Sequence, residues 1–230
     1  MQYQFSPSEL DYLPAKCVRC YYLLKVNKIK NENFPPPVFS NFDVIQQAYF
    51  KNMNTNELTD QLPSGRIMQK NEIPGKIVST TLKDNKGREF LLGGRPDIVT
   101  AFDDGSYGII DFKTTNIKED KAENYRHQLE AYRQIFKNPG AIKKGLIPKL
   151  EPITQMGVLQ FEPNKIISHN EQGAQINLEM SYSNLEMNES KFYKKITSII
   201  DLLSQKELPE FNDKCSDCTF VKEQIKMSAK

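Results

Sequence analysis

The chain has 230 residues, of which 38% are hydrophobic and 26% are charged, and its formal net charge is +2. This size and composition suit a globular domain, and the near-neutral charge excludes a protein that coats nucleic acid through overall basicity, while leaving room for a local basic groove. No apolar segment approaches the ~20 residues that cross a bilayer, and the N-terminus lacks the order of a signal peptide. We therefore expect a cytoplasmic protein with no membrane partner.

The first predicted element is a short helix near the N-terminus. Ser6, Pro7 and Glu9 match a capping box with proline at the first helical position, and the helix should end near Pro14. The apolar segment 17–26 that follows should be buried.

The next predicted elements are a proline-rich connector at 31–39 and a helix at 41–52. The spacing of apolar residues in this helix predicts one buried face. That face comprises Val44, Ile45, Ala48, Tyr49 and Phe50.

The central part of the chain has the composition of strands. Residues 72–102 predict strands, with hairpin turns at 84–87 and 103–106, and residues 119–137 predict a helix that ends at the Asn-Pro-Gly segment. The apolar stripe of this helix comprises Tyr125, Leu129, Tyr132 and Phe136.

The last predicted elements are a strand at 155–161, a hairpin at 165–182 and an amphipathic helix at 188–207 capped by Asn188. Its inward residues are Phe192, Ile196, Ile199 and Leu203. The order of elements predicts an α/β or α+β fold with a mixed central sheet flanked by helices.

Two aspartates and a lysine are placed in otherwise apolar strands. The three-residue loop 103–105 fits a hairpin whose last loop residue is a left-handed glycine. Such a loop pairs Asp97 with Asp111 on one face of the sheet, and Lys113 lies on the same face. Because paired like charges destabilise a sheet, we expect a protonated aspartate or a bound divalent cation. The alternative is a buried Asp–Lys pair with the other aspartate in solvent.

Three motifs in this region resemble the PD-(D/E)XK nuclease superfamily. The segment GGRPD ends at Asp97, and the segment IIDFKTT carries Asp111 and Lys113 as the family's (D/E)-x-K motif does. The segment HQLEAY resembles the Gln-x-x-x-Tyr motif of the RecB-like branch, with Gln128 and Tyr132 on one helix face. The cysteines extend the resemblance to RecB-like nucleases with a cysteine cluster, including the CRISPR-associated exonucleases and AddB-type helicase–nucleases.

The resemblance implies a restriction-endonuclease-like core and Mg²⁺- or Mn²⁺-dependent hydrolysis of DNA phosphodiester bonds. By this match, Asp97, Asp111 and the carbonyl of Phe112 hold the metal. Lys113 orients or activates the attacking water and stabilises charge on the phosphate. Two further positions steady the site or contact the DNA backbone, namely Gln128 and Tyr132.

One ligand of the family pattern is missing from the chain. Many RecB-like nucleases place a histidine on a helix before the first strand, but neither His127 nor His169 precedes Asp97. We consider Asp43 and Glu72 as substitutes, with a surface role as the alternative for each.

Four cysteines form two C-x-x-C pairs near the two ends of the chain. Cys17 and Cys20 form one pair and Cys215 and Cys218 the other, and two such pairs complete a tetrahedral metal site. In a reducing compartment, metal binding is favoured over disulfides. Zinc suits this spacing, whereas the resemblance favours a [4Fe–4S] cluster, although its usual division is one cysteine in front and three behind. We expect the cluster, with zinc as the alternative, in a structural role.

We expect one nuclease-like domain over residues 1–230, with a core at 65–165. The helical segments 1–60 and 185–230 should form a subdomain around the cysteines. The leading hypothesis is a deoxyribonuclease of DNA repair, recombination or defence that acts on single- or double-stranded DNA, beside a helicase or another repair or recombination protein. The alternatives are a weak or inactive nuclease-fold protein that binds nucleic acid or acts as a scaffold, and a zinc-stabilised interaction domain.

Overall fold

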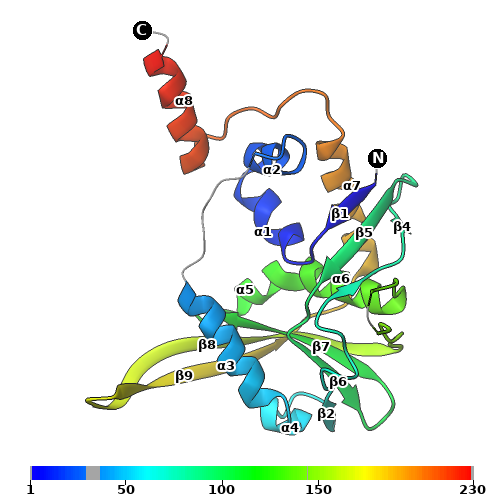
Figure 1. Cartoon of the computed structure of the whole chain (residues 1–230), viewed down its shortest axis with the longest axis vertical. Helices are drawn as coiled ribbons and strands as arrows, with labels where there is room; N and C mark the ends of the chain where they lie inside the picture. The colour runs from blue at the N-terminus through cyan, green and yellow to red at the C-terminus, as the bar shows by residue number, and fades with distance from the viewer. Residues whose placement is uncertain (1, 30–36, 144, 229–230) are drawn as a thin grey trace.

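The larger of two β-sheets runs through the middle of the molecule. The structure is a computed structural model that describes residues 2–29, 37–143 and 145–228 (Figure 1). In this sheet the first, second and fourth neighbouring pairs are antiparallel, and the central pair β7–β8 is parallel, so the sheet is mixed as predicted. Its strands, in spatial order, are β2 (Gly65–Ile67), β6 (Ile98–Phe102), β7 (Tyr107–Thr114), β8 (Ile153–Asn170) and β9 (Gly173–Asn184).

A smaller sheet forms around a strand that leads into the candidate site. Its centre is β5 (Glu89–Gly94), which pairs in parallel with the N-terminal strand β1 (Tyr3–Phe5). The antiparallel neighbours of β5 are β3 (Ile77–Val78) and β4 (Leu82–Lys83). The turn predicted at 84–87 joins β4 to β5, with Gly87 at φ +77°.

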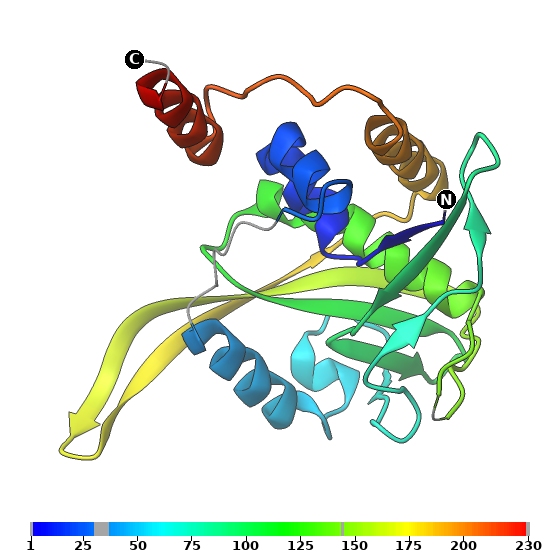
Figure 2. The ribbon, with the colours of Figure 1, turned by 45° about the horizontal axis from the view of Figure 1, so that its top comes forward.

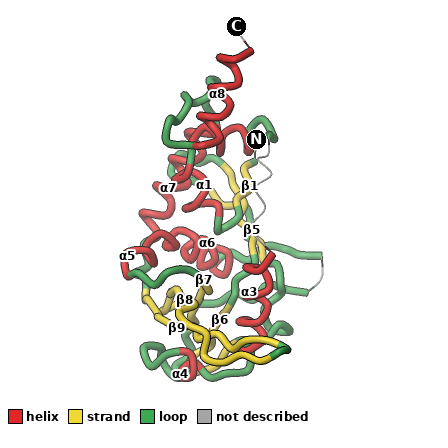
Figure 3. Tube along the Cα trace, turned by 90° about the vertical axis from the view of Figure 1, so that its left-hand side faces the viewer, coloured by secondary structure: helices red, strands yellow, loops and turns green. Residues whose placement is uncertain are grey.

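Helices cover both faces of the larger sheet. On one face, α6 (Arg126–Lys137) and α7 (Glu189–Leu203) close the main hydrophobic core, with α1 (Glu9–Lys16) packed on α6. On the other face, α3 (Pro37–Phe50) and α4 (Thr55–Leu58) cover a second core around Phe112. Figure 3 shows α1, α6 and α7 gathered above the sheet and α4 below it.

Two helices from opposite halves of the chain contact each other outside these layers. The helix α2 (Val18–Lys25) follows α1 directly, and α8 (Ser216–Ser228) extends away from the body of the protein (Figure 1). None of the helices within the described ranges is both long and apolar enough to span a bilayer.

Several predicted boundaries differ from the structure. The first helix begins at Glu9, so Pro7 lies in a turn before it and not at its first position, and the helix continues past Pro14 to Lys16. The predicted helix 119–137 is divided into α5 (Glu119–Ala122), a 3-10 turn (Glu123–Tyr125) and α6. The connector predicted at 31–39 lies outside the described residues up to position 36, and 37–39 form the first turn of α3.

The prediction of the buried face of α3 was wrong except at Phe50. Val44, Ile45 and Tyr49 are 67%, 63% and 67% exposed, whereas Gln46 and Phe50 are 4% and 5% exposed. The helix therefore turns a mixed polar and aromatic side toward the sheet and leaves most of its aliphatic residues on the outside.

The predicted strand at 155–161 and the hairpin at 165–182 are parts of one long ribbon. β8 passes through the sheet and continues to Asn170, where a tight turn leads into β9. The part of this ribbon beyond Phe161, residues 162–180, projects from the body (Figures 1 and 2), and we call it the arm.

Candidate active site

The β6–β7 hairpin has the predicted register. The amide of Gly105 donates to the carbonyl of Phe102 over 3.0 Å, and Gly105 has φ +84°, which a glycine adopts without strain. Ile98 is paired with Ile110, so the preceding residue, Asp97, is brought to the position opposite Asp111. The short loop thus places the two carboxylates together.

Asp97 lies in the segment that joins β5 to β6. Its Oδ2 accepts a 2.9 Å hydrogen bond from the amide of Phe112, and its Oδ1 accepts a 3.1 Å bond from Nε2 of Gln47 on α3. Burial, and next the charge of Asp111, raise the pKa of Asp97 to about 7. Asp97 is therefore easily protonated unless a cation neutralises the pair.

Asp111 is buried on β7 and has two side-chain partners. Its Oδ1 accepts a 2.6 Å hydrogen bond from Nε2 of Gln128, and its Oδ2 forms an ion pair with Lys113. Burial raises the pKa of Asp111, and the positive charge of Lys113 only partly offsets this effect.

Lys113 lies against the carboxylate of Asp111 and an aromatic ring. Burial alone would lower its pKa, but the charges of Asp111 and Asp97 outweigh burial, and the net shift of the pKa is upward. Its Nζ lies 5.0 Å from the ring centroid of Tyr125, within the range of a cation–π contact. The sequence stripe assigned Tyr125 to the core, and its contact with Lys113 was not predicted.

The helix α6 fixes the position of Gln128 at its first turn. The carboxylate of Asp11 accepts a 3.1 Å hydrogen bond from the amide of Gln128 and lies 2.5 Å from Nδ1 of His127. A carboxylate at a helix N-terminus satisfies free amides and interacts favourably with the helix dipole. His127 is thus engaged by α1.

Tyr132 supports the segment that carries Asp97. Its hydroxyl donates to the carbonyl of Arg95 over 2.7 Å. The backbone at Gly94 passes so close that a Cβ there would lie 2.7 Å from Pro7 and 3.0 Å from the ring of Tyr132. This close approach is a physical reason for glycine in the GGRPD segment.

The two candidate substitutes for the missing histidine have different surroundings. Glu72 accepts hydrogen bonds of 2.6 and 2.7 Å from Arg66, which is the first cause of a pKa lowered to about 2. Asp43 lies one helical turn before Gln47 on α3, and its charge raises the pKa values of Asp97 and Asp111. The role of Gln47 at the site was not predicted, and its signal in the sequence is the four-residue spacing from Asp43, which puts both side chains on one side of the helix.

A buried glutamine beside Lys113 was also missed. Gln160 on β8 is the register partner of Lys113 and is 0% exposed. Neither its Oε1 nor its Nε2 has a hydrogen-bond partner among the described residues. An unpaired buried amide is costly, so this position calls for a polar partner such as an ordered water.

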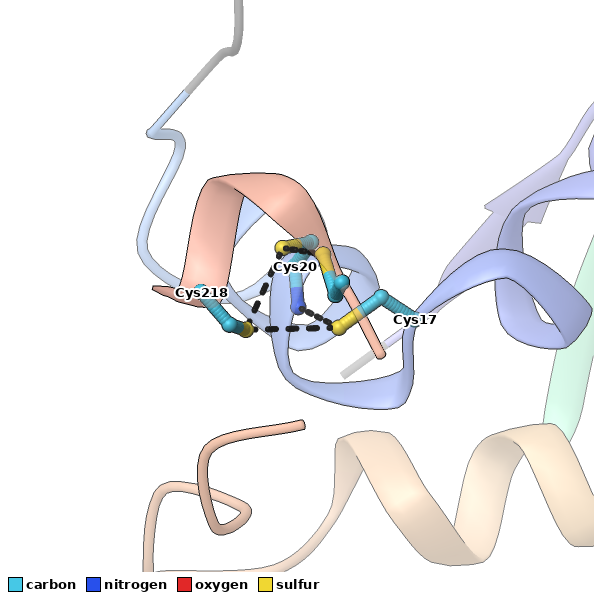
Figure 4. Close-up of side chains that lie close together, drawn as sticks. Cys17, Cys20 and Cys218 are labelled. Atoms are coloured by element: carbon cyan, nitrogen blue, oxygen red, sulfur yellow. Dashed lines mark hydrogen bonds between the residues drawn. The ribbon is translucent and has the colours of Figure 1, made fainter. Parts of the chain in front are cut away.

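The four cysteines lie together, as their spacing predicts. Figure 4 shows Cys17, Cys20 and Cys218 with their sulfurs turned toward one another. The Sγ–Sγ distances are 3.5 Å for Cys17–Cys218, 3.7 Å for Cys20–Cys215 and 3.8 Å for Cys20–Cys218, and all four sulfurs lie within 4.8 Å. The thiols are free, so this cluster is a candidate metal site.

Side chains of α2 also hold the segment that leads to the second cysteine pair. Arg19 donates to the carbonyl of Pro209 over 2.6 Å, and its guanidinium lies 3.8 Å from the ring centroid of Phe211. Tyr22 donates to the carbonyl of Gln205 over 2.8 Å. These contacts and the cluster together hold the segment 205–218 against α2.

A mixed sheet that brings two acidic residues and a lysine together on neighbouring strands defines a restriction-endonuclease-like nuclease fold. A model of the PD-(D/E)XK nuclease superfamily matches residues 46–222. The chain therefore belongs to the PD-(D/E)XK nuclease superfamily.

The comparison with solved structures supports the same fold. The chain is similar to the crystal structure of SSO0001, with a TM-score of 0.50 and 14% identity, over 95% of this chain and 84% of that one. At this identity the likeness bears on the fold alone. No curated protein sequence matches the chain significantly.

Proposed function

We propose that the protein is a Mg²⁺- or Mn²⁺-dependent deoxyribonuclease of the RecB-like branch that hydrolyses phosphodiester bonds at Asp97, Asp111 and Lys113. The observation that carries this proposal is the register that places Asp97 opposite Asp111, with Lys113 in an ion pair with Asp111. Burial raises the pKa of both aspartates, in keeping with this arrangement. Perturbed pKa values concentrate at functional sites because reactive charges must be held where a structural role would avoid them.

The residues fit a divalent cation. The carboxylates of Asp97 and Asp111 lie opposite each other on neighbouring strands, and the ammonium of Lys113 is in contact with Oδ2 of Asp111. Carboxylate and carbonyl oxygens are the ligands that Mg²⁺ and Mn²⁺ prefer. Asp97, Asp111 and the carbonyl of Phe112 would hold the ion, with Asp43 and Gln47 at its α3 side.

Each side chain then has a role that follows from its contacts. A bound cation supplies a lowered pKa for water and positive charge at the phosphate. Lys113 orients the attacking water and stabilises negative charge on the phosphate oxygens. Gln128 keeps Asp111 in one orientation, and Tyr132 holds the backbone of the Asp97 segment.

The test is cleavage of single- and double-stranded DNA, linear and circular, with and without Mn²⁺. We expect metal-dependent cleavage by the wild type and a loss of at least roughly a thousandfold in Asp111→Asn. Asp201→Asn is the matched control, because Asp201 pairs with Lys86 and Arg88 on the surface. An intact substrate under every condition, with salt-sensitive DNA binding retained, would favour the inactive binding module instead.

The same proposal extends to the biological setting. We propose that the protein acts on DNA in the cytoplasm during repair, recombination or defence, with a helicase or another repair or recombination protein as its partner. We further propose that residues 1–230 form one nuclease domain with a core at 65–165. Segments 1–60 and 185–230 would form the cysteine subdomain.

For the cysteine cluster we propose a single zinc ion with a structural role. Four thiolates at about 2.3 Å from one zinc form a tetrahedron whose edges are about 3.8 Å, close to the three Sγ–Sγ distances of 3.5–3.8 Å. A [4Fe–4S] cluster inserts iron and sulfide between the thiolates and needs a wider arrangement. The spacing therefore favours zinc over the iron–sulfur cluster that the resemblance suggests.

Metal analysis of the purified protein separates the two ions. We expect one zinc per chain, no iron and a colourless solution. A brown protein that absorbs near ~400 nm and contains about four irons per chain would contradict the zinc proposal and restore the iron–sulfur cluster.

A further inference from the structure

The outward side of α3 is apolar and uncovered. Val38, Ile45 and Tyr49 lie at positions i, i+7 and i+11, so they form one stripe along the helix, and they are 49%, 63% and 67% exposed. Asp43 and Gln47 lie on another side of α3, toward the carboxylate site. The helix therefore serves the site with one side and presents an unpartnered apolar stripe with another.

One face of the arm is apolar as well. In β9, Ile176 and Met180 lie on the same face as Tyr182, and the polar residues that alternate with them lie on the opposite face. Ile176 is paired with Ile166 of β8. Ile166, Ile176 and Met180 are 65%, 51% and 45% exposed. An exposed apolar ribbon of two strands is only marginally stable alone, so this face requires a cover.

The opposite face of the arm has the polar character of a solvated surface. Asn164 donates to Glu179 over 2.7 Å and accepts from Asn177 over 2.8 Å. Ser168 donates to Gln175 over 2.7 Å. The arm is therefore amphipathic, with one apolar face and one polar face that suits contact with water.

The apolar face of the arm is on the side of the sheet that carries α3. Met180 is the register partner of Phe161, whose ring lies 5.9 Å from that of Phe50 on α3. Figure 2 shows the arm curving toward the side on which α3 lies. We call these two apolar elements together the α3–arm surface, and its residues are Val38, Ile45, Tyr49, Ile166, Ile176 and Met180.

The charge of this surface excludes two kinds of occupant. The described part of α3 contains no lysine or arginine. The arm has one lysine, Lys165, and three acidic residues, namely Glu162, Glu171 and Glu179. Binding to nucleic acid or to an anionic membrane needs a cluster of basic residues. A protein surface is the remaining class of occupant.

The area of the surface matches what a dimer requires. Half-exposed large side chains contribute on the order of 100 Å² each, so these six residues reach about 600 Å² in one copy, and two copies reach about 1,200 Å² in total, the lower end of the range for a specific interface. A projecting ribbon and a helix side are complementary in form. A two-fold contact can therefore bury both elements of both copies with no other surface.

We infer that the α3–arm surface is an interface between two copies of this chain, in which the arm of each copy lies on α3 of the other. The inference does not depend on nuclease activity, because it rests on the exposed residues and their charge. The dimer would hold α3 in place and thus the side chain of Gln47 against Asp97.

The test is the mass of the full chain in solution, by light scattering on a sizing column at roughly 50 µM, well above the micromolar dissociation constant of a weak interface of this size. We expect twice the 26.5 kDa of one chain. Ile45→Glu on α3 and Ile176→Glu on the arm should each give a monomer with an unchanged circular dichroism spectrum.

Ile225→Glu is the matched control, because Ile225 on α8 is 57% exposed and lies outside the surface. This variant should stay dimeric. A monomeric wild type overturns the inference, even if another protein is found to bind the surface. A dimer that survives either Ile45→Glu or Ile176→Glu also overturns it, since each element must be needed.

Discussion

The carboxylate site and the cysteine cluster are built in opposite ways. The carboxylate site takes its acids and lysine from one hairpin, with Asp97 and Lys113 only sixteen positions apart. The cysteine cluster joins Cys17 to Cys218 across 201 positions. The first is set by local register inside a packed sheet, and the second depends on closure of almost the whole chain at its periphery. This difference predicts that the two sites respond separately to substitution.

The largest expected effect sharpens the local side of this comparison. Lys113→Ala should lower DNA cleavage by at least roughly a thousandfold, since it removes the positive charge nearest Asp111. Without added divalent ions it should also destabilise the fold by about 3–5 kcal/mol, because a buried carboxylate loses its partner. Urea unfolding with and without Mn²⁺ measures the second effect.

Lys137→Ala is the control for this prediction, because Lys137 pairs with Glu189 at the surface. It should change cleavage and stability little. If Lys113→Ala cleaves DNA as the wild type does, the lysine has no part in the reaction.

The second largest effect concerns the cysteine cluster, whose residues are distant from one another in the sequence. Cys218→Ser should release the metal and lower stability by several kcal/mol, since metal binding energy is folding energy in such sites. Cleavage per folded molecule at low temperature should stay within about twofold, because no contact links the cluster to Asp97 within the described residues. Thermal unfolding and initial rates check the two parts. A rate that falls with the metal content would show that the sites are coupled.

The third effect is the pH dependence of the carboxylate pair. The pKa of Asp97 is about 7 in the fold, above its ordinary value, so its contribution to stability is full below pH ~4 and is lost as pH rises through 7. Without added Mg²⁺ or Mn²⁺, the wild type should lose up to a few kcal/mol between pH 5 and 8 that Asp97→Asn retains. Urea midpoints across this range measure it, and equal slopes for both proteins would contradict it.

The smallest effect concerns the α3 side of the site. Gln47→Ala removes one 3.1 Å hydrogen bond to Asp97 and should cost about 1 kcal/mol, or roughly fivefold in cleavage. Asn56→Ala, on the exposed part of α4, is a control that should leave the rate unchanged. A loss of a hundredfold would give Gln47 a direct role at the metal.

The parts of the molecule that could be predicted from the sequence are those set by short-range geometry. The glycine at position 105 fixes the loop, the loop fixes the register, and the register brings Asp97 opposite Asp111. The inward residues of α7 followed from the same kind of local pattern, since Phe192, Ile196, Ile199 and Leu203 are all buried.

The parts that could not be predicted depend on what covers each element. The apolar spacing in α3 was read as its buried face, but the site needs Gln47 inward, and that rotation leaves Ile45 and Tyr49 outside. The contact of Tyr125 with Lys113 and the unpaired amide of Gln160 arise between different elements that tertiary packing brings together. The spacing of apolar residues indicates that a helix is amphipathic, whereas tertiary packing decides which of its faces is buried.

The span between the two cysteine pairs has a consequence for synthesis. Cys17 and Cys20 are synthesised about two hundred residues before Cys215 and Cys218, so the cluster can close only after the residues of the sheet between them have been made. The nuclease core can therefore be assembled before the cluster closes. We expect metal shortage during growth to leave molecules with a folded nuclease core and an unclosed cysteine cluster. In such molecules a protease should cleave first at α8.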